Sequence, residues 1–316
     1  VVIAIPQKGV NAVREEALEN KLAEYKASLT EEEKERLIAD TVHLHEYQEE
    51  PSSKEDLEKI PMLRREDLKK TALSLKNRIV MSGETKFVHH EMYSNGIDYL
   101  SLMFDIRDIE PEELPYLGIL KSVLGYVATE SYSYAELANE INIHTGGVGS
   151  SIGIYPNVKK YDQLAFMYEI RTKVLAEKLS DSMRLMEEML LTSKISDEKR
   201  LYEILGELKS RLQVGLSASG HQVASTRAMS YFSRTSYYQD ATSGIACYRV
   251  IADYESNFEA KKAELIEKLE KLLRRIFTAD RLMVSITCAE SDFVAVEEAV
   301  NELKAKLYEP DASSTR

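Results

Sequence analysis

Side chains that could bind a metal ion stand together at His89-His90-Glu91. Imidazole and carboxylate groups are common ligands of Zn²⁺, and a zinc hydrolase needs imidazoles at a fixed spacing near a carboxylate. This run lies in a stretch rich in aromatic and β-branched residues, which predicts a β-strand. Neighbouring side chains on a strand point to opposite faces, so His89 and His90 cannot share one metal ion. We expect one of them to point inward and the other outward.

The other histidines are no better placed for a metal site. His43 and His45 stand two positions apart on a predicted helix, where such side chains do not face each other. His144 falls at a predicted helix C-terminus, where a cation suits the helix dipole, and His221 falls at a predicted helix kink. No serine, cysteine or paired-carboxylate constellation suggests catalysis. The sequence therefore predicts no catalytic residue, no metal ligand and no cofactor-binding residue in this chain.

The glycine-rich run Gly146-Gly147-Val148-Gly149 resembles a phosphate-binding loop only superficially. Phosphate-binding loops lead into a helix N-terminus. This run instead leaves a predicted helix over 133–144 and enters a strand that ends near Tyr155. We interpret it as a helix stop followed by close packing. A GxGxxG fingerprint followed by a helix is absent, so a nucleotide-binding fold is excluded.

The predicted elements around this run follow a distinctive order. Strand-like runs over 85–93 and 97–105 flank Asn95-Gly96. Asn-Gly between two strands is the strongest short signal for a hairpin, so we predict that these two strands pair. An apolar helix over 111–127, the capped helix over 133–144 and the glycine-rich strand follow.

This order resembles the half-domain unit of the insulinase/pitrilysin family of zinc metallopeptidases. The run His-His-Glu-Met-Tyr-Ser-Asn-Gly-Ile-Asp-Tyr-Leu over 89–100 is similar to the third domain of the presequence-protease branch, which includes falcilysin-like enzymes. The resemblance covers nearly the whole chain. It implies a fragment that holds the helical linker between the enzyme's halves and the third, non-catalytic domain. In the parent it implies two halves that close around unstructured peptides, with zinc bound in the first domain.

The family's zinc motif, His-x-x-Glu-His, is absent from this chain. In catalytic family domains the motif lies on the helix between the opening strands and the Gly-Gly segment. Here residues 114–124 hold no histidine, and the last acid before them is Glu113. Leucine and isoleucine cannot replace imidazole ligands. We therefore predict that this fragment is inactive by itself and that zinc belongs to the parent's first domain.

The resemblance implies at most a lining role for the glycine-rich strand. In catalytic relatives the corresponding strand edge lines the substrate cleft. We expect that five residues here line the wall of the chamber: Gly147, Val148, Gly149, Ser150 and Ser151. The implied partners are the other domains of the same polypeptide and unstructured peptide substrates.

Composition restricts the remaining partners. The net charge of −12 argues against nucleic acid and against anionic membranes. No run approaches the ~18 apolar residues that a membrane span needs. Cys247 and Cys288 lack metal-ligand spacing and form no disulfide framework, so we expect a reducing compartment, the cytoplasm.

The first quarter of the chain differs in character from the rest. Residues 1–6 form an apolar run ended by proline, either an edge strand of the main domain or, as the resemblance implies, the last strand of a missing upstream domain over 1–8. Residues 9–76 predict a helical hairpin linker. Its first helix aligns Leu18 and Leu22 on one face, and Thr30 begins a capping box for the second.

The remainder predicts one non-catalytic α/β metallopeptidase-like domain over 77–309, with a linker to a missing downstream domain over 310–316. Its strands are few and mix with helices, so the predicted fold class is α+β. We expect a mixed or antiparallel sheet with helices packed mainly on one face, preceded by the α-helical hairpin. The alternative function is a non-catalytic relative that acts as an interaction or assembly module. An independent hydrolase with an unrecognised site is a third possibility.

Overall fold

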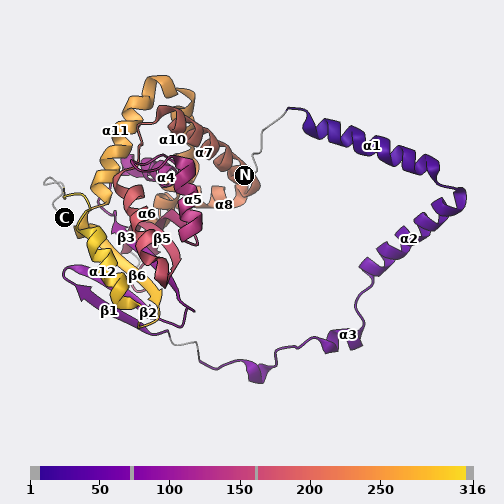
Figure 1. Cartoon of the computed structure of the whole chain (residues 1–316), viewed down its shortest axis with the longest axis horizontal. Coiled ribbons are helices and arrows are strands. Elements are labelled where there is room, and N and C mark those ends of the chain that lie inside the picture. The colour runs from indigo at the N-terminus through magenta and orange to yellow at the C-terminus, as the bar shows by residue number, and fades with distance from the viewer. Residues whose placement is uncertain (1–7, 72–74, 161–162, 311–316) are drawn as a thin grey trace. The chain divides into compact units, whose positions relative to one another are not determined.

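A computed structural model of the chain describes residues 8–71, 75–160 and 163–310 (Figure 1). The chain divides into two compact units, Val1–Leu73 and Ser74–Arg316. The predicted strand over residues 1–6 and most of the predicted linker over 310–316 lie outside the described residues.

The described part of the first unit is helical and has no buried side chain in its helices. The elements are α1 (Val10–Ser28), α2 (Glu31–Glu49), α3 (Lys54–Lys59) and the short 3₁₀ helix η1 (Arg65–Asp67). The predicted capping box is present, because the Thr30 hydroxyl accepts from the Glu33 amide and the Glu33 carboxylate accepts from the Thr30 amide. The apolar face predicted on α1 is uncovered, with Leu18 and Leu22 each 55% exposed.

The second unit is built on a six-stranded sheet of order β1-β2-β6-β3-β5-β4. The strands are β1 (Asn77–Ser82), β2 (Thr85–Glu91), β3 (Ile97–Asp105), β4 (Val148–Pro156), β5 (Leu164–Leu175) and β6 (Leu282–Cys288). The pair β2–β6 is parallel, and the other four neighbouring pairs are antiparallel. The predicted α+β class with a mixed sheet is confirmed.

The predicted pairing of the strands on either side of Asn95-Gly96 is wrong. β6 lies between β2 and β3, with Val284 opposite Phe87 on one side and Leu102 on the other. The turn itself has the expected backbone, with φ of 54° at Asn95 and 74° at Gly96. A turn signal fixes only the local backbone, whereas burial of the alternating apolar residues of β6 decides which strands become neighbours.

The true hairpin partner of β2 is β1, a strand that the sequence patterns did not reveal. The two strands are joined by a two-residue loop, Gly83-Glu84, so that Ser82 is opposite Thr85. Gly83 has a φ of 59°, a left-handed conformation that suits glycine at the first central position of a tight hairpin turn. β1 is therefore one edge of the sheet and β4 is the other.

The helices of the second unit pack against one face of the sheet. They are η2 (Pro111–Glu113), α4 (Leu114–Val123), α5 (Tyr134–His144), η3 (Ala176–Lys178), α6 (Leu179–Leu191), α7 (Glu198–Ala218), α8 (Gly220–Met229), α9 (Arg234–Ser243), α10 (Ile245–Ser256), α11 (Phe258–Ile276), η4 (Ala279–Arg281) and α12 (Phe293–Lys304). The predicted break near residue 219 is present between α7 and α8. α9 was not predicted, and α7 is capped by Asp197 rather than by Ser196 as predicted.

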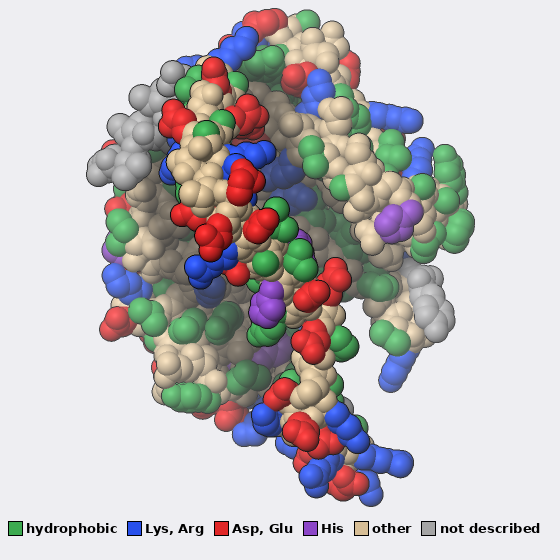
Figure 2. Space-filling model, turned by 90° about the vertical axis from the view of Figure 1, so that its right-hand side faces the viewer, with side chains coloured by type: hydrophobic (Ala, Val, Ile, Leu, Met, Phe, Trp, Pro, Cys, Tyr) green, Lys and Arg blue, Asp and Glu red, His purple; other side chains and the backbone are tan. Residues whose placement is uncertain are grey.

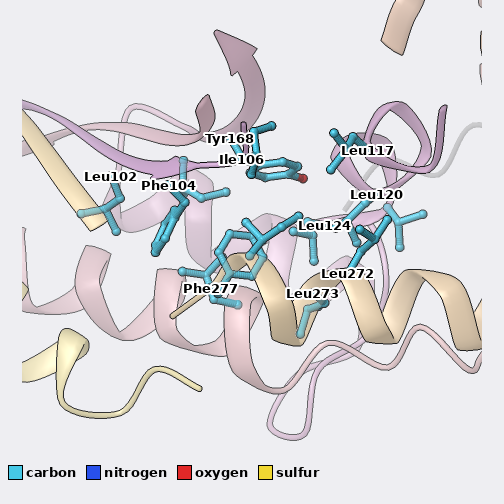
Figure 3. Packing of buried hydrophobic residues seen from close by; sticks show 14 of the residues in the cluster. Leu102, Phe104, Ile106, Leu117, Leu120, Leu124, Tyr168, Leu272, Leu273 and Phe277 are labelled. Atoms are coloured by element: carbon cyan, nitrogen blue, oxygen red, sulfur yellow. The ribbon is translucent and has the colours of Figure 1, made fainter. Parts of the chain in front are cut away.

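The core lies between this face of the sheet and the helices. Phe87, Val284, Leu102 and Ile170 form one row across four neighbouring strands, and all four are fully buried. Phe277, which follows α11, meets the strands from the helical layer. Its ring packs edge-on against Phe104 and Tyr168, with ring centroids 5.0 and 5.4 Å apart (Figure 3). Such edge-to-face pairs stabilise a core beyond the area that they bury.

Candidate functional site on the open face of the sheet

α4 stands where the resemblance places the zinc helix, and it is a packing element. Eight of its ten residues are buried, and none carries an imidazole, a thiol or a carboxylate. A zinc ion does not fit these side chains. Gly118 allows close contact with the neighbouring helices, because a Cβ there would lie 2.3 Å from the Thr242 carbonyl oxygen. Within the described ranges, no group of three or more His, Cys, Asp and Glu side chains could hold a metal ion.

His89 and His90 point to opposite faces of the sheet, as predicted. His89 is fully buried and stacks on Phe293, with ring centroids 4.7 Å apart. His90 lies on the other face, where Nδ1 is 2.6 Å from Asn77 Oδ1 and Nε2 is 3.1 Å from Ser285 Oγ. Both imidazoles therefore serve the packing and hydrogen bonding of the sheet.

The other histidines are dispersed. His43 and His45 are exposed on α2, and His221 is exposed on α8. His144 ends α5, as predicted, and its Nδ1 lies 3.1 Å from Asp181. The structure brings no two of these four side chains together.

A carboxylate without partners lies in the core beside β6. Asp98 is fully buried, and neither of its oxygens has a hydrogen-bond partner among the residues that the structure describes. Burial, together with the charge of Asp292, raises the pKa of Asp98 to about 6. Burial also raises the pKa of the free thiols Cys247 and Cys288 to about 12, so both cysteines are unreactive.

The strand residues that alternate with the core residues form the open face of the sheet, which points away from the helices. Two neighbouring rows cross this face. One row contains Thr287, Tyr99 and Lys173, and the next contains Ser285, Ser101, Arg171 and Gly149. Most of these side chains are polar, which is the pattern of a sheet face in contact with water or a ligand.

Arg171 is held on the open face by a buried carboxylate. The fully buried Glu169 accepts a hydrogen bond from the Tyr155 hydroxyl and forms an ion pair with Arg171. Arg171 Nη2 also donates to Tyr155 Oη over 3.2 Å. Burial works to lower the pKa of Arg171, but the neighbouring Glu169 carboxylate outweighs it and raises that pKa. Gly153 leaves room for this arrangement, since a Cβ there would lie 2.0 Å from Glu169 Oε1.

A shallow hollow of about 560 Å³ lies on the open face where β3, β5 and β6 meet the glycine-rich turn. Arg171 and Lys173 are its two cations. Its polar lining also includes the hydroxyl side chains of Tyr99, Ser101, Thr172, Ser285 and Thr287. Gly146, Gly147 and Gly149 form the side of the hollow next to β4 and leave it open.

The model of the peptidase M16-C associated family matches residues 5–253, most of the chain. This chain belongs to that peptidase-associated family. Protein HypA of Clostridium perfringens (strain 13 / Type A) is 31% identical over 306 residues, which are 97% of this chain and 31% of that protein. Presequence protease 1, chloroplastic/mitochondrial, of Arabidopsis thaliana is 24% identical over 304 residues, 95% of this chain and 28% of the protease. The resemblance to the presequence-protease branch of the insulinase family is confirmed.

The chain thus spans about a third of the length of the curated relatives that it matches. Among solved structures, a conserved protein from Enterococcus faecalis V583 superposes with a TM-score of 0.51 at 12% identity. The match covers 75% of this chain and 54% of that one, and it shows the shared fold.

The five residues that the insulinase resemblance suggested for the chamber wall divide between the two faces of β4. Gly149 and Ser151 lie on the open face, where they are opposite Arg171 and Glu169. Val148 and Ser150 alternate with them and point toward the helices. Gly147 precedes the strand, at a φ of 115°. Their contact with a substrate stays a prediction.

Sequence reasoning missed the polar side chains that the fold of this peptidase-associated family gathers beside these glycines. Glu169, Arg171 and Lys173 alternate along β5, and their period of two was the available signal. That period shows that the residues share a face of the sheet. It does not show that the face is uncovered, nor which strands bring further polar groups to it.

Acidic and basic side chains are interspersed on the face of the molecule drawn in Figure 2. Within residues 8–71, 75–160 and 163–310, no helix combines the length and apolar character needed to cross a bilayer. The exclusion of nucleic acid and membranes as partners stays a prediction from the net charge of −12.

Proposed function

We propose that this chain is the non-catalytic portion of a zinc-dependent metalloendopeptidase that degrades unstructured peptides in a closed chamber. The helical first unit is a tether between the halves of the enzyme, and the open face of the second unit forms part of the chamber wall. Membership in the peptidase-associated family supports the peptidase context. The presequence proteases that the chain matches are about three times longer, which supports a catalytic domain elsewhere in the polypeptide.

The observation that carries the proposal is the character of the open face. Beside the polar rows it presents methionines from four strands: Met81, Met103, Met167 and Met283. On the edge strand β1, Met81 is 57% exposed and Ile79 is 62% exposed. Methionine is flexible and polarisable, so a surface rich in it adapts to peptides of varied sequence. A wall for unstructured substrates needs this adaptability.

Zinc belongs to the first domain of the parent enzyme in this proposal, since the residues of α4 do not fit the ion. There the ion would activate water and polarise the scissile carbonyl group. This chain contributes enclosure and substrate contact. Its proposed partners are the other domains of the same polypeptide and unstructured peptides, and its proposed compartment is the cytoplasm, which the two free buried cysteines support.

A cleavage assay tests the division of labour. The 316-residue chain is incubated with zinc and an unstructured peptide, and we expect no cleavage. Cleavage that requires zinc and stops on addition of a chelator would overturn the assignment. The full parent enzyme is the positive control.

Crosslinking in the parent enzyme tests the chamber wall. A photoreactive benzoylphenylalanine replaces Tyr99, which is 48% exposed on the open face, or Tyr126, which is 60% exposed beyond the end of α4. We expect substrate peptide to crosslink at Tyr99 and not at Tyr126. Equal labelling at both positions, or labelling at Tyr126 alone, would contradict the placement of the wall.

The second candidate is a non-catalytic family relative that docks partner proteins. The uncovered apolar residues of α1, such as Leu18 and Leu22, favour this function. The parent gene separates the two candidates. An upstream segment that encodes His-x-x-Glu-His supports the peptidase, and its absence supports the docking module.

A further inference from the structure

The hollow on the open face is distinguished by the charges in its lining. The chain has 53 acidic and 41 basic residues, yet the side chains around the hollow include two cations and no carboxylate. Arg171 and Lys173 come from neighbouring positions on one face of β5. In a strongly acidic protein, a cationic hollow is a local exception that attracts an anionic group.

Arg171 is prepared to bind an anion. Both of its contacts, to Glu169 and Tyr155, use Nη2. Within the described residues, Nη1 and Nε have no hydrogen-bond partner, so these nitrogens can donate to a ligand. The guanidinium group is planar and binds carboxylates through two parallel hydrogen bonds. Because Glu169 is fully buried, it orients the arginine without occupying the hollow.

Lys173 provides a second positive charge that no carboxylate neutralises among the residues that the structure describes. Its aliphatic stem crosses Gly146, where a Cβ would lie 2.6 Å from the lysine Cγ and Cε. The Gly146 amide also donates to the Lys173 carbonyl over 2.8 Å. The stem is therefore seated against the glycine turn, which places the ammonium group at the side of the hollow.

Hydroxyl groups complete the floor between the cations and β6. Ser101 and Ser285 are opposite each other in the row that contains Arg171, and Tyr99 and Thr287 are opposite each other in the row that contains Lys173. Each hydroxyl can donate one hydrogen bond to an oxygen atom of a ligand. Two cations and four hydroxyls therefore face the same volume.

We propose that this hollow binds a carboxylate group of a peptide, either a free C-terminus or an acidic side chain. The inference rests on the proposed function only in taking the ligand to be a peptide. Arg171 and Lys173 pair with the carboxylate, the hydroxyls donate to its remaining lone pairs, and the peptide chain leaves past the glycines of β4. An anchored carboxylate holds one end of an otherwise unstructured substrate against the wall.

Peptide binding to the full 316-residue chain tests the carboxylate and its source. One fluorescent peptide without acidic residues is made with a free C-terminus, with an amidated C-terminus, and amidated with one internal Gln→Glu change. Fluorescence anisotropy gives the three affinities. Tighter binding of the free acid assigns the hollow to C-termini, and tighter binding of the Glu peptide assigns it to acidic side chains.

Equal binding of all three peptides overturns the inference and leaves the proposed function intact. Absence of binding by all three also overturns it, and the crosslinking experiment in the parent enzyme then decides the proposed function separately. Weaker binding of the two carboxylate peptides than of the neutral one would contradict a cationic site directly.

Variants of the chain locate the site. Lys173→Met keeps the aliphatic stem and removes the charge, and we expect it to weaken carboxylate binding about tenfold. The control is Lys86→Met, an exposed lysine on the same face of β2, which does not line the hollow. Equal effects of the two substitutions, or no effect of either, would overturn the location.

A second pair of variants fills the hollow without removing a charge. A Cβ at Gly149 meets no atom within 4 Å, so Gly149→Leu adds a side chain beside Arg171 without strain. Gly215→Leu on α7, where a Cβ also meets no atom within 4 Å, is the control. We expect only Gly149→Leu to abolish the preference for carboxylate peptides. Retention of that preference would show that the carboxylate binds elsewhere.

Discussion

Arg281 forms hydrogen bonds with both carboxylate oxygens of Asp108, one from each terminal nitrogen of its guanidinium group. The bond from Nη2 to Oδ2 is 2.6 Å long, and Nη1 also donates to the Asp105 carbonyl over 2.8 Å. The Arg281 side chain is only 4% exposed. This contact joins the turn before β6 to the loop after β3, so it fixes the beginning of the strand at the centre of the sheet.

Removal of the Asp108 carboxylate should destabilise the second unit. We expect Asp108→Ala to lower the free energy of unfolding by about 3 kcal/mol, because it leaves a buried guanidinium group without its counter-charge. Urea unfolding followed by circular dichroism measures the loss. Glu259→Ala, which removes an 85% exposed partner of Lys262, is the control and should have a much smaller effect. Similar losses in both variants would contradict a special role for Asp108.

The same contact should make stability depend on pH at the acidic end. The Arg281 hydrogen bonds lower the pKa of Asp108 to about 2, against the opposing effect of burial. A carboxyl group with a lower pKa in the folded state stabilises the fold above its unfolded value of about 4, and this contribution is lost as the pH falls toward 2. We expect Asp108→Asn to flatten the pH dependence of the unfolding free energy between about pH 4 and pH 2. A parallel decline in both proteins would refute it.

Asp98 should have the opposite effect. Burial raises its pKa to about 6 in the folded state, so the stability that it contributes is complete below about pH 4 and is lost as the pH rises through 6. We expect Asp98→Asn to stabilise the chain by about 2 kcal/mol at about pH 8 and to change stability little at about pH 4. Urea unfolding at the two pH values measures this difference. A variant that is less stable at the higher pH would indicate a partner for the carboxylate.

Helix positions and caps were predictable from the sequence because their causes are local. Ser133 and Glu136 form the capping box expected at the start of α5, and Leu201, Ile204 and Leu205 lie on the buried face of α7. The neighbours of β3 were not predictable, because Asn95-Gly96 reports a turn and carries no information about β6.

The candidate site was predictable only in part, for a similar reason. The Gly146-Gly147 helix stop located the strand beside it. Arg171 and Lys173 look like solvated charges in a sequence, because periodicity assigns them to a face without saying what lies opposite. Their meeting with Ser285 and Thr287 depends on the insertion of β6, which is a property of the complete sheet.

Gly118 should tolerate no side chain at all. A Cβ there would lie 2.3 Å from the Thr242 carbonyl oxygen and 2.9 Å from Cys247 Sγ. We expect Gly118→Ala to cost about 3 kcal/mol of unfolding free energy, because α4 must move away from α9 and α10. Thermal or urea unfolding tests this expectation.

Gly206→Ala is the matched control for Gly118, since a Cβ at that α7 position meets no atom within 4 Å. Alanine is a better helix former than glycine, so this variant should be stabilised by up to about 1 kcal/mol. Equal destabilisation of both variants would contradict the proposed crowding at α4.

The insertion of β6 also has a consequence for synthesis of the chain. A ribosome releases β2 and β3 long before it makes the strand that must separate them, and the Asn95-Gly96 turn leaves these two strands next to each other in the meantime. If they pair early, that hairpin must open again before Leu282–Cys288 can enter. Such long-range strand pairing folds slowly, and the waiting strand edges are where the nascent chain is most exposed to aggregation.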